Sequence, residues 1–161
     1  MRTKHSVSAI IDENVSIGEG SFIWYFSHVM RGAKIGKRTT IGEKCFIGQN
    51  VVIGDDVKIG NNTNIYEGAV IKDRVFIGNN VSFNNVKVPV AHRKAQRYLP
   101  TIVDNNVSIG ANVTILPGIM IEEGAIIGDG TCVVLPVPRY CLVVGNPGRI
   151  IKGNVRETKN D

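Results

Sequence analysis

Aliphatic residues recur at every sixth position along much of this chain, and this spacing dominates its hydrophobic pattern. The first series keeps one register over residues 11–88 and contains thirteen units. Their opening residues are Ile11, Ile17, Ile23, Val29, Ile35, Ile41, Ile47, Ile53, Ile59, Ile65, Ile71, Ile77 and Phe83. A glycine often follows the opener, and the fifth position of a unit is usually small or β-branched. A six-residue repeat of this kind predicts a β-solenoid.

The repeat also predicts which residues lie over one another. The opener and the fifth residue of each unit would point inward, and the glycine with its neighbours would turn the chain through a corner. Three units then close a triangular coil of eighteen residues, and coils stack at about 4.8 Å. We therefore expect one interior ladder of Ile11, Val29, Ile47, Ile65 and Phe83.

The pattern stops after Val88 and resumes at Val103, and the gap is not a multiple of six. If the order of faces is kept, fourteen residues, 89–102, form a projecting loop. The second series has openers Val103, Ile109, Ile115, Ile121, Ile127 and Val133, and its last fifth position is Val137. Nineteen units make a little over six coils. This division predicts a lead-in over residues 1–10, an all-β solenoid domain over 11–153 and a polar tail over 154–161.

Composition narrows the class of protein. A chain of 161 residues is one domain, able to bury roughly 70% of its unfolded surface. The three cysteines have no metal-ligand spacing, which favours reduced thiols in a cytoplasmic protein, and no segment has the pattern of a signal peptide or a membrane span. A net charge of +5 suits an anionic small molecule, whereas the basic stripe with interleaved aromatics typical of nucleic-acid binding is missing from the sequence.

The repeat resembles that of the left-handed β-helix acyltransferases, the hexapeptide-repeat family. The left-handed sense is implied by the family, not by the periodicity. Five stretches are similar to the members that N-acetylate nucleotide-linked amino sugars, as in 3-amino sugar pathways for surface glycans. They are residues 23–29 (IWYFSHV), 65–68 (IYEG), 83–86 (FNNV), 108–115 (SIGANVTI) and 142–149 (LVVGNPGR).

The resemblance implies an acetyl-CoA-dependent enzyme that needs no metal and acts on a small molecule, a dTDP- or UDP-linked amino sugar. It further implies a homotrimer with active sites between subunits, where the loop of one chain reaches the next. The family's coenzyme lies along a groove of the late coils and ends near a final glycine-proline turn. The matching positions here are Gly110, Ala111, Gly128, Gly130, Gly145, Pro147 and Arg149.

Stacking brings a set of polar residues together where the loop leaves the solenoid. Glu67 is expected one coil under Asn85, and Tyr66 one coil under Asn84, each pair about 5 Å apart. Such groups suit sugar hydroxyls and an amine. Asn85 matches an asparagine near the reaction centre of the resembling enzymes and is expected to orient the amine for direct attack on the thioester. Glu67 is the candidate general base; alternatively the departing thiolate collects the proton.

Histidine and arginine supply the remaining candidates. His28 should lie three coils below Ser82, about 14 Å along the axis, too far to join Asn85 within one chain, although a neighbouring subunit could bring it in. We retain it as a catalytic candidate, with a structural corner beside Trp24 as the alternative. His92 lies on the loop. Arg93 and Arg97 nearby could bind a diphosphate, or could equally form a solvated surface.

Two other functions remain open on the sequence. A metal-dependent hydratase like the γ-class carbonic anhydrases needs a close pair of histidines and a third. Here His5, His28 and His92 are far apart in sequence. A non-enzymatic solenoid scaffold is the other alternative, because a fold alone implies no chemistry.

Overall fold

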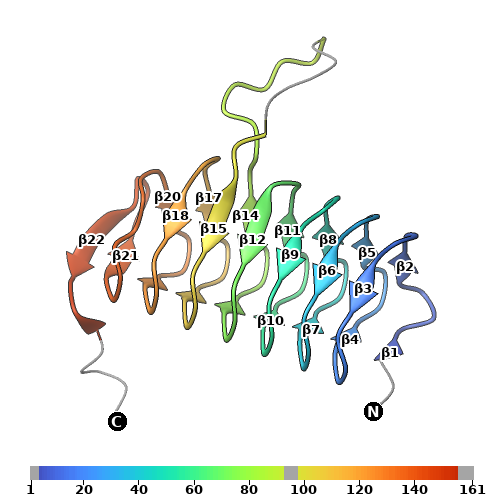
Figure 1. Ribbon diagram of the computed structural model, residues 1–161. Helices are drawn as coiled ribbons and strands as arrows, with labels where there is room; N and C mark the ends of the chain where they lie inside the picture. The colour runs from blue at the N-terminus through green and yellow to red at the C-terminus, as the bar shows by residue number, and fades with distance from the viewer. Residues whose placement is uncertain (1–3, 93–97, 156–161) are drawn as a thin grey trace.

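The chain winds into a three-sided parallel β-helix of about seven coils, from which one loop projects (Figure 1). The computed structural model describes residues 4–92 and 98–155. Every named element is a short β-strand, usually of two residues, and three such strands with three corners make each coil. The all-β solenoid predicted from the six-residue repeat is confirmed.

Each side of the β-helix is one sheet, and we name the sheets by their number of strands. The nine-stranded sheet has the order β1 (Lys4–His5), β4 (Phe22–Ile23), β7 (Thr40–Ile41), β10 (Lys58–Ile59), β13 (Phe76–Ile77), β16 (Ser108–Ile109), β19 (Ile126–Ile127), β21 (Leu142–Val144) and β22 (Arg149–Lys152). The seven-stranded sheet has the order β2 (Ile10–Ile11), β5 (His28–Val29), β8 (Phe46–Ile47), β11 (Asn64–Ile65), β14 (Ser82–Phe83), β17 (Thr114–Ile115) and β20 (Cys132–Val133). The six-stranded sheet has the order β18 (Met120–Ile121), β15 (Thr101–Val103), β12 (Ala69–Ile71), β9 (Val52–Ile53), β6 (Lys34–Ile35) and β3 (Ser16–Ile17). All pairs are parallel except β21 with β22.

The eighteen-residue register is confirmed strand by strand. Ile11 pairs with Val29, Val29 with Ile47, Ile47 with Ile65, and Ile65 with Phe83, which is the predicted ladder. Four of these five side chains are fully buried, and Ile11 at the end of the stack is partly buried. The openers and the apolar fifth residues of all three sheets form one continuous core.

Close stacking explains the glycine that follows so many openers. A Cβ atom added to Gly36 would lie 2.4 Å from the carbonyl carbon of Gly54 in the next coil. No side chain fits at that distance, so only glycine, which has no Cβ atom, can occupy this corner. Buried hydroxyls at the fifth position serve the same corners, since Ser27 and Thr63 donate hydrogen bonds to the glycine carbonyls fifteen residues ahead, at 2.7 and 2.9 Å.

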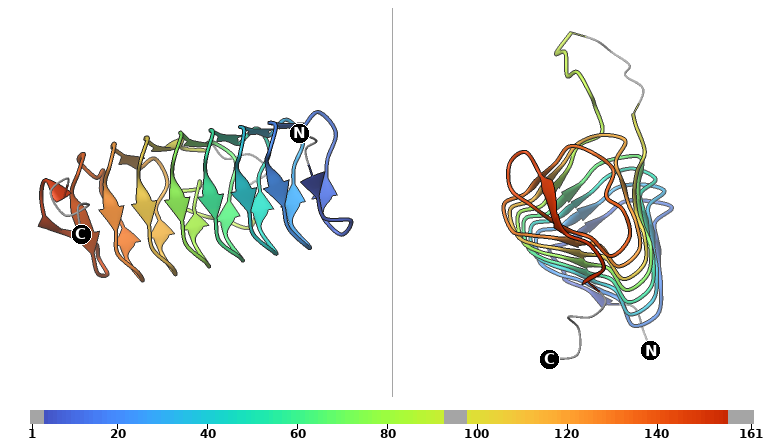
Figure 2. Two further views of the ribbon diagram at one scale, coloured as in Figure 1. Left: turned by 90° about the horizontal axis from the view of Figure 1, so that it is seen from below. Right: turned by 90° about the vertical axis from the view of Figure 1, so that its left-hand side faces the viewer.

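The projecting loop has the predicted length but begins three residues earlier. Ala69 pairs with Thr101, a separation of 32 residues, which is one coil plus fourteen. Asn85 still lies over Glu67, and the Leu99 amide donates to the Asn85 carbonyl at 3.1 Å to close the base. The loop therefore spans residues 86–99 instead of 89–102, because Thr101 already belongs to β15. Figure 2 shows the first described part of the loop, residues 86–92, extending away from the coils.

Both ends of the β-helix extend the predicted pattern. Lys4 and His5 form β1 and pair with β4, within the segment predicted as a lead-in. At the other end, Val137 forms a bridge with Ile121, only sixteen residues away, so this coil is two residues shorter than the others. The assignment of Val137 to a fifth position was therefore wrong: it takes the place of an opener. Val143 pairs with Ile127 at the same shortened spacing.

Two further properties bear on the class of protein. Among the described residues, no helix has both the length and the apolarity that crossing a bilayer requires. Cys45, Cys132 and Cys141 are free thiols, and burial raises the pKa of the Cys45 thiol.

Candidate active site

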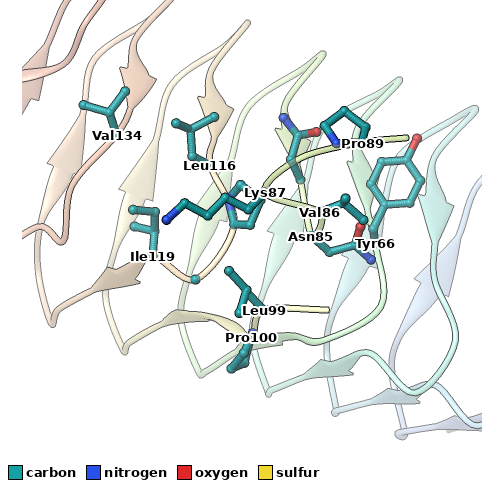
Figure 3. A pocket seen from close by; sticks show the side chains of 13 residues that line it. Tyr66, Asn85, Val86, Lys87, Pro89, Leu99, Pro100, Leu116, Ile119 and Val134 are labelled. Atoms are coloured by element: carbon teal, nitrogen blue, oxygen red, sulfur yellow. The ribbon is translucent and has the colours of Figure 1, made fainter. Parts of the chain in front are cut away.

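A cavity of about 830 Å³ lies at the foot of the projecting loop. It follows the corner between the seven-stranded and six-stranded sheets, which we call the loop corner. Its lining consists of Tyr66, Asn84, Asn85, Val86, Lys87, Pro89, Leu99, Pro100, Leu116, Pro117, Gly118, Ile119 and Val134. Figure 3 shows Tyr66 and Asn85 at one end of this space, with Leu116 and Val134 toward the other. One end of the cavity is thus polar and the other apolar, and Figure 3 shows the Lys87 side chain between them, directed toward Ile119.

The polar end brings together three residues predicted from stacking. Tyr66 follows β11, and Asn84 and Asn85 follow β14 one coil later. The Asn85 side-chain amide donates to the main-chain carbonyl of Glu67 at 3.0 Å, and the Ser82 and Asn84 side chains are hydrogen-bonded at 3.1 Å. Because a carbonyl can only accept, the NH₂ group of Asn85 must face Glu67. Its Oδ1 atom is then the one available to accept a hydrogen bond from a ligand.

Glu67 lies one coil below Asn85 as predicted, but its contact with Asn85 is through the main chain. Its side chain is half-buried and does not belong to the lining of the cavity. The role of Glu67 as a general base stays a prediction.

His28 lies on β5, three paired strands from Ser82, as the stacking predicts. Its Nε2 atom is 2.9 Å from Oδ1 of Asp12, and the hydrogen bond from His28 lowers the pKa of the Asp12 carboxyl. The ring also meets Phe46 edge-on, with 5.9 Å between centroids. His28 thus contacts Asp12 and Phe46. Its role, whether catalytic or that of a structural polar residue beside Trp24, stays a prediction.

The basic loop candidates are only partly described. His92 is exposed on the loop. Arg93 and Arg97 lie outside the described residues, so their predicted contact with a diphosphate stays a prediction.

The predicted coenzyme positions lie on another edge of the β-helix. Gly110, Ala111, Gly128 and Gly130 belong to the corner between the nine-stranded and seven-stranded sheets, which we call the distal corner. Their amide groups already donate within the chain, to Ile127 O, Asp129 Oδ1, Val143 O and Ala111 O, respectively, each at 2.8 Å. Any contact from these residues to a coenzyme would therefore use carbonyl groups or close approach, not amide donors.

Arg149 is nearer the loop corner. It begins β22 and lines a second cavity, of about 190 Å³, that shares Val134 with the first. Gly145 and Pro147 lie in the exposed turn before it, where the Asn146–Pro147 peptide bond is cis. The two cavities follow one another along the loop corner toward the C-terminal end.

The apolar half of the first cavity was missed by the sequence reasoning. Leu116 and Pro117 lie one coil beyond Asn84 and Asn85, at the separation of 32 residues that the loop imposes, and Val134 follows Leu116 by eighteen. The stacking rule that located Asn85 could have found all three.

No group of three His, Cys, Asp or Glu side chains in residues 4–92 and 98–155 is placed to hold one ion.

Comparison with known proteins identifies the repeat. The family described as bacterial transferase hexapeptide (six repeats) matches residues 14–49, 38–73 and 50–85, and the hexapeptide repeat of succinyl-transferase matches residues 100–134. Together they cover more than half of the chain.

Curated relatives are similar over part of their length. A serine acetyltransferase from Bacillus subtilis is 35% identical over 95 residues, which are 58% of this chain and 43% of that protein. A 2,3,4,5-tetrahydropyridine-2,6-dicarboxylate N-acetyltransferase from Clostridium perfringens is 41% identical over 61 residues, 38% of this chain and 26% of that protein. The chain spans at most half of the length of such relatives.

Solved structures share the fold. The hexapeptide-repeat acetyltransferase VCA0836 from Vibrio cholerae superposes with a TM-score of 0.66 at 26% identity, over 86% of this chain and 73% of that one. PerB from Caulobacter crescentus, solved with CoA and GDP-perosamine, has a TM-score of 0.61 at 18% identity, over 93% of this chain and 57% of that one. The repeat, the family match and the fold agree: this chain belongs to the hexapeptide-repeat transferase family.

Proposed function

We propose that this protein is an acetyl-CoA-dependent N-acetyltransferase that modifies the amine of a nucleotide-diphosphate-linked amino sugar. The observation that carries the proposal is the cavity at the foot of the loop. Its polar end, with Tyr66, Asn84 and Asn85, suits a sugar that bears an amine, and its apolar end suits the arm of an acyl carrier. The named activities of the relatives support acetyl transfer.

The chemistry follows from the orientation of Asn85. Oδ1 of Asn85 would accept a hydrogen bond from the uncharged amine and hold its lone pair toward the thioester carbonyl. The nitrogen forms a bond to the carbonyl carbon, the carbon–sulfur bond breaks, and the proton of the amine passes to the departing thiolate or to Glu67. Tyr66 and Asn84 would bind hydroxyls of the sugar ring.

The acyl donor would lie along the loop corner. The apolar wall of Leu116, Ile119 and Val134 would pack against the pantetheine arm, and the second cavity continues this path to Arg149. The Arg149 side chain is exposed, and guanidinium groups bind phosphates well. The anionic end of the coenzyme is therefore proposed to lie near Arg149.

A homotrimer would unite the two sets of predicted residues. The cavity lies at the loop corner, and Gly110, Ala111, Gly128 and Gly130 lie at the distal corner, across the seven-stranded sheet. In a closed ring of like chains, a surface of one subunit faces a different surface of the next. The distal corner of one chain would then cover the loop corner of its neighbour, which places the active site between subunits.

A thiol-release assay tests the proposed function. Purified protein, acetyl-CoA and a panel of uridine and thymidine diphosphate amino sugars should release free thiol with at least one 3-amino sugar, of the kind used for surface glycans, and mass spectrometry should find the acetylated product. The matching sugars with a hydroxyl in place of the amine are the control. If acetyl-CoA neither raises the melting temperature nor is consumed with any member, the transferase proposal fails.

Blocking the apolar end of the cavity should weaken the binding of acetyl-CoA and leave the binding of the sugar unchanged. Val134 lines both cavities, so Val134→Trp should fill the passage and raise the KM for acetyl-CoA by about tenfold or more, with little change in the KM for the sugar. Val52→Trp, at a partly exposed position on the six-stranded sheet, is the matched control. Equal KM values in the two variants would exclude this path for the coenzyme.

A further inference from the structure

An aromatic strip extends from the polar end of the cavity along the outer face of the seven-stranded sheet. It consists of Tyr66, Phe46 and His28, which we call the aromatic strip. Ring centroids are 5.5 Å apart between Tyr66 and Phe46 and 5.9 Å apart between Phe46 and His28. Tyr66 is 40% exposed, and the His28 side chain is 35% exposed. Phe46 between them is half-buried. Partly exposed rings in series offer a stacking surface for planar ligands.

Hydrogen bonds fix the polarity of His28 at the end of this strip. Asp12 accepts at both carboxylate oxygens, from Nε2 of His28 at 2.9 Å and from the Arg31 amide at 3.1 Å. Because an ionised carboxylate only accepts, Nε2 must carry the hydrogen. In the neutral imidazole, Nδ1 is then a hydrogen-bond acceptor. The lowered pKa of Asp12 agrees with an ionised carboxylate.

We propose that the aromatic strip binds the base of the acceptor nucleotide, stacked on Phe46, and that Nδ1 of His28 accepts a hydrogen bond from a ring N–H of that base. This inference rests on the proposed function and adds to it the class of nucleotide. Uracil, thymine and guanine present a ring N–H on their pairing edge. Cytosine and adenine present an unprotonated ring nitrogen there, which would face a second acceptor.

The length of the strip fits such a ligand. His28 lies three paired strands from Ser82, close to Asn85, a distance of about 14 Å at one interstrand spacing per coil. One hexose ring cannot span that distance, whereas a sugar joined through a diphosphate to a nucleoside can. An amine at Asn85 and a base on Phe46 are thus the two ends of one extended acceptor.

The decisive variant is Asp12→Asn, because it should reverse the polarity of His28. The Arg31 amide must face an acceptor, so it selects the oxygen of the new side chain and leaves the NH₂ group toward Nε2. Nε2 then becomes the acceptor, and Nδ1 carries the hydrogen. Calorimetry on the natural protein should show that it binds UDP about tenfold more tightly than CDP. In Asp12→Asn, this preference should be lost or inverted.

Two more variants separate stacking from hydrogen bonding. Phe46→Ala should weaken the binding of UDP and of CDP to the same extent, by roughly tenfold or more. His28→Phe keeps a ring in the strip and should remove only the preference for UDP. Phe76→Ala, an exposed phenylalanine on the nine-stranded sheet, is the control and should bind both nucleotides as the natural chain does.

Several outcomes would overturn the proposal. An unchanged ratio of UDP to CDP affinity in both Asp12→Asn and His28→Phe would exclude His28 as the reader of the base. A smaller assembly in Phe46→Ala, measured by light scattering, with nucleotide affinities unchanged, would identify the strip as a contact between subunits.

The assays also separate this inference from the proposed function. Thiol release with no discrimination among nucleotides would leave the transferase standing and remove the base site. A preference for UDP over CDP without thiol release from any amino sugar would leave the base site standing and remove the transferase.

Discussion

Replacing Asn85 with alanine should lower kcat/KM for acetyl transfer by roughly 100-fold, because the amine would lose the group that orients it. Among the described residues, the side chain makes one hydrogen bond, to the Glu67 carbonyl, so the fold should lose little stability. Measurements of thiol release and of the melting temperature on the same preparation distinguish the two effects. Most of the loss is expected in kcat, since Tyr66 and Asn84 would still bind the sugar.

A matched control uses an asparagine away from both the loop corner and the distal corner. Asn105 accepts a hydrogen bond from the Asp73 amide at 3.0 Å, so Asn105→Ala also removes one side-chain contact. Its rate should equal that of the natural chain. If Asn85→Ala and Asn105→Ala turn over at similar rates, the site is not where the cavity indicates.

Glu67→Ala separates the two routes for the proton. If the Glu67 carboxylate is the general base, its removal should lower the rate by about 100-fold or more, and the loss should shrink at high pH, where more of the amine is uncharged. If the thiolate collects the proton, the rate of Glu67→Ala should stay close to that of the natural chain. The carbonyl that positions Asn85 belongs to the main chain at residue 67 and remains in the variant. Near-normal rates in both Glu67→Ala and Asn85→Ala would exclude the proposed site.

Most of the fold was predictable because one spacing controls it. A residue at every sixth position faces the core, so the ladder from Ile11 to Phe83 follows from counting. The six-residue spacing did not predict the strands whose opener is not aliphatic or the coils whose length differs from eighteen residues. His5 occupies an opener's place in β1 without being apolar, and the coil that contains Val137 is two residues short. The loop was placed three residues late because Thr101 pairs before the next opener, Val103.

Resemblance selected Asn85 as a candidate, and stacking predicted which residues lie beside it. Tyr66 and Asn85 meet at one cavity because eighteen residues make a coil. Gly110 and Gly128 were chosen by resemblance, and because they follow the openers Ile109 and Ile127, the register places both at one corner; their contact with a coenzyme stays a prediction. Phe46 follows His28 by eighteen residues, so their contact was predictable from stacking. The bond between His28 and Asp12 was not, since it depends on side-chain direction across a corner, and the repeat fixes only the backbone.

The largest effect on stability is expected from Ile53→Asp. Ile53 is 2% exposed in the six-stranded sheet and pairs with Ile35 on one side and Ile71 on the other. The change removes about 1.5–3 kcal/mol of apolar burial, and an ionised carboxylate in the core costs several kcal/mol more. Since domains are stable by about 5–15 kcal/mol, the variant should not fold cooperatively. Circular dichroism and chemical denaturation would measure this, with Ile53→Val, expected to lose about 0.5–1.5 kcal/mol, as the control. Coils contact only their neighbours. If the melting temperature of Ile53→Asp lay within a few degrees of that of the natural chain, the coils around Ile53 would not be needed for the stability of the solenoid.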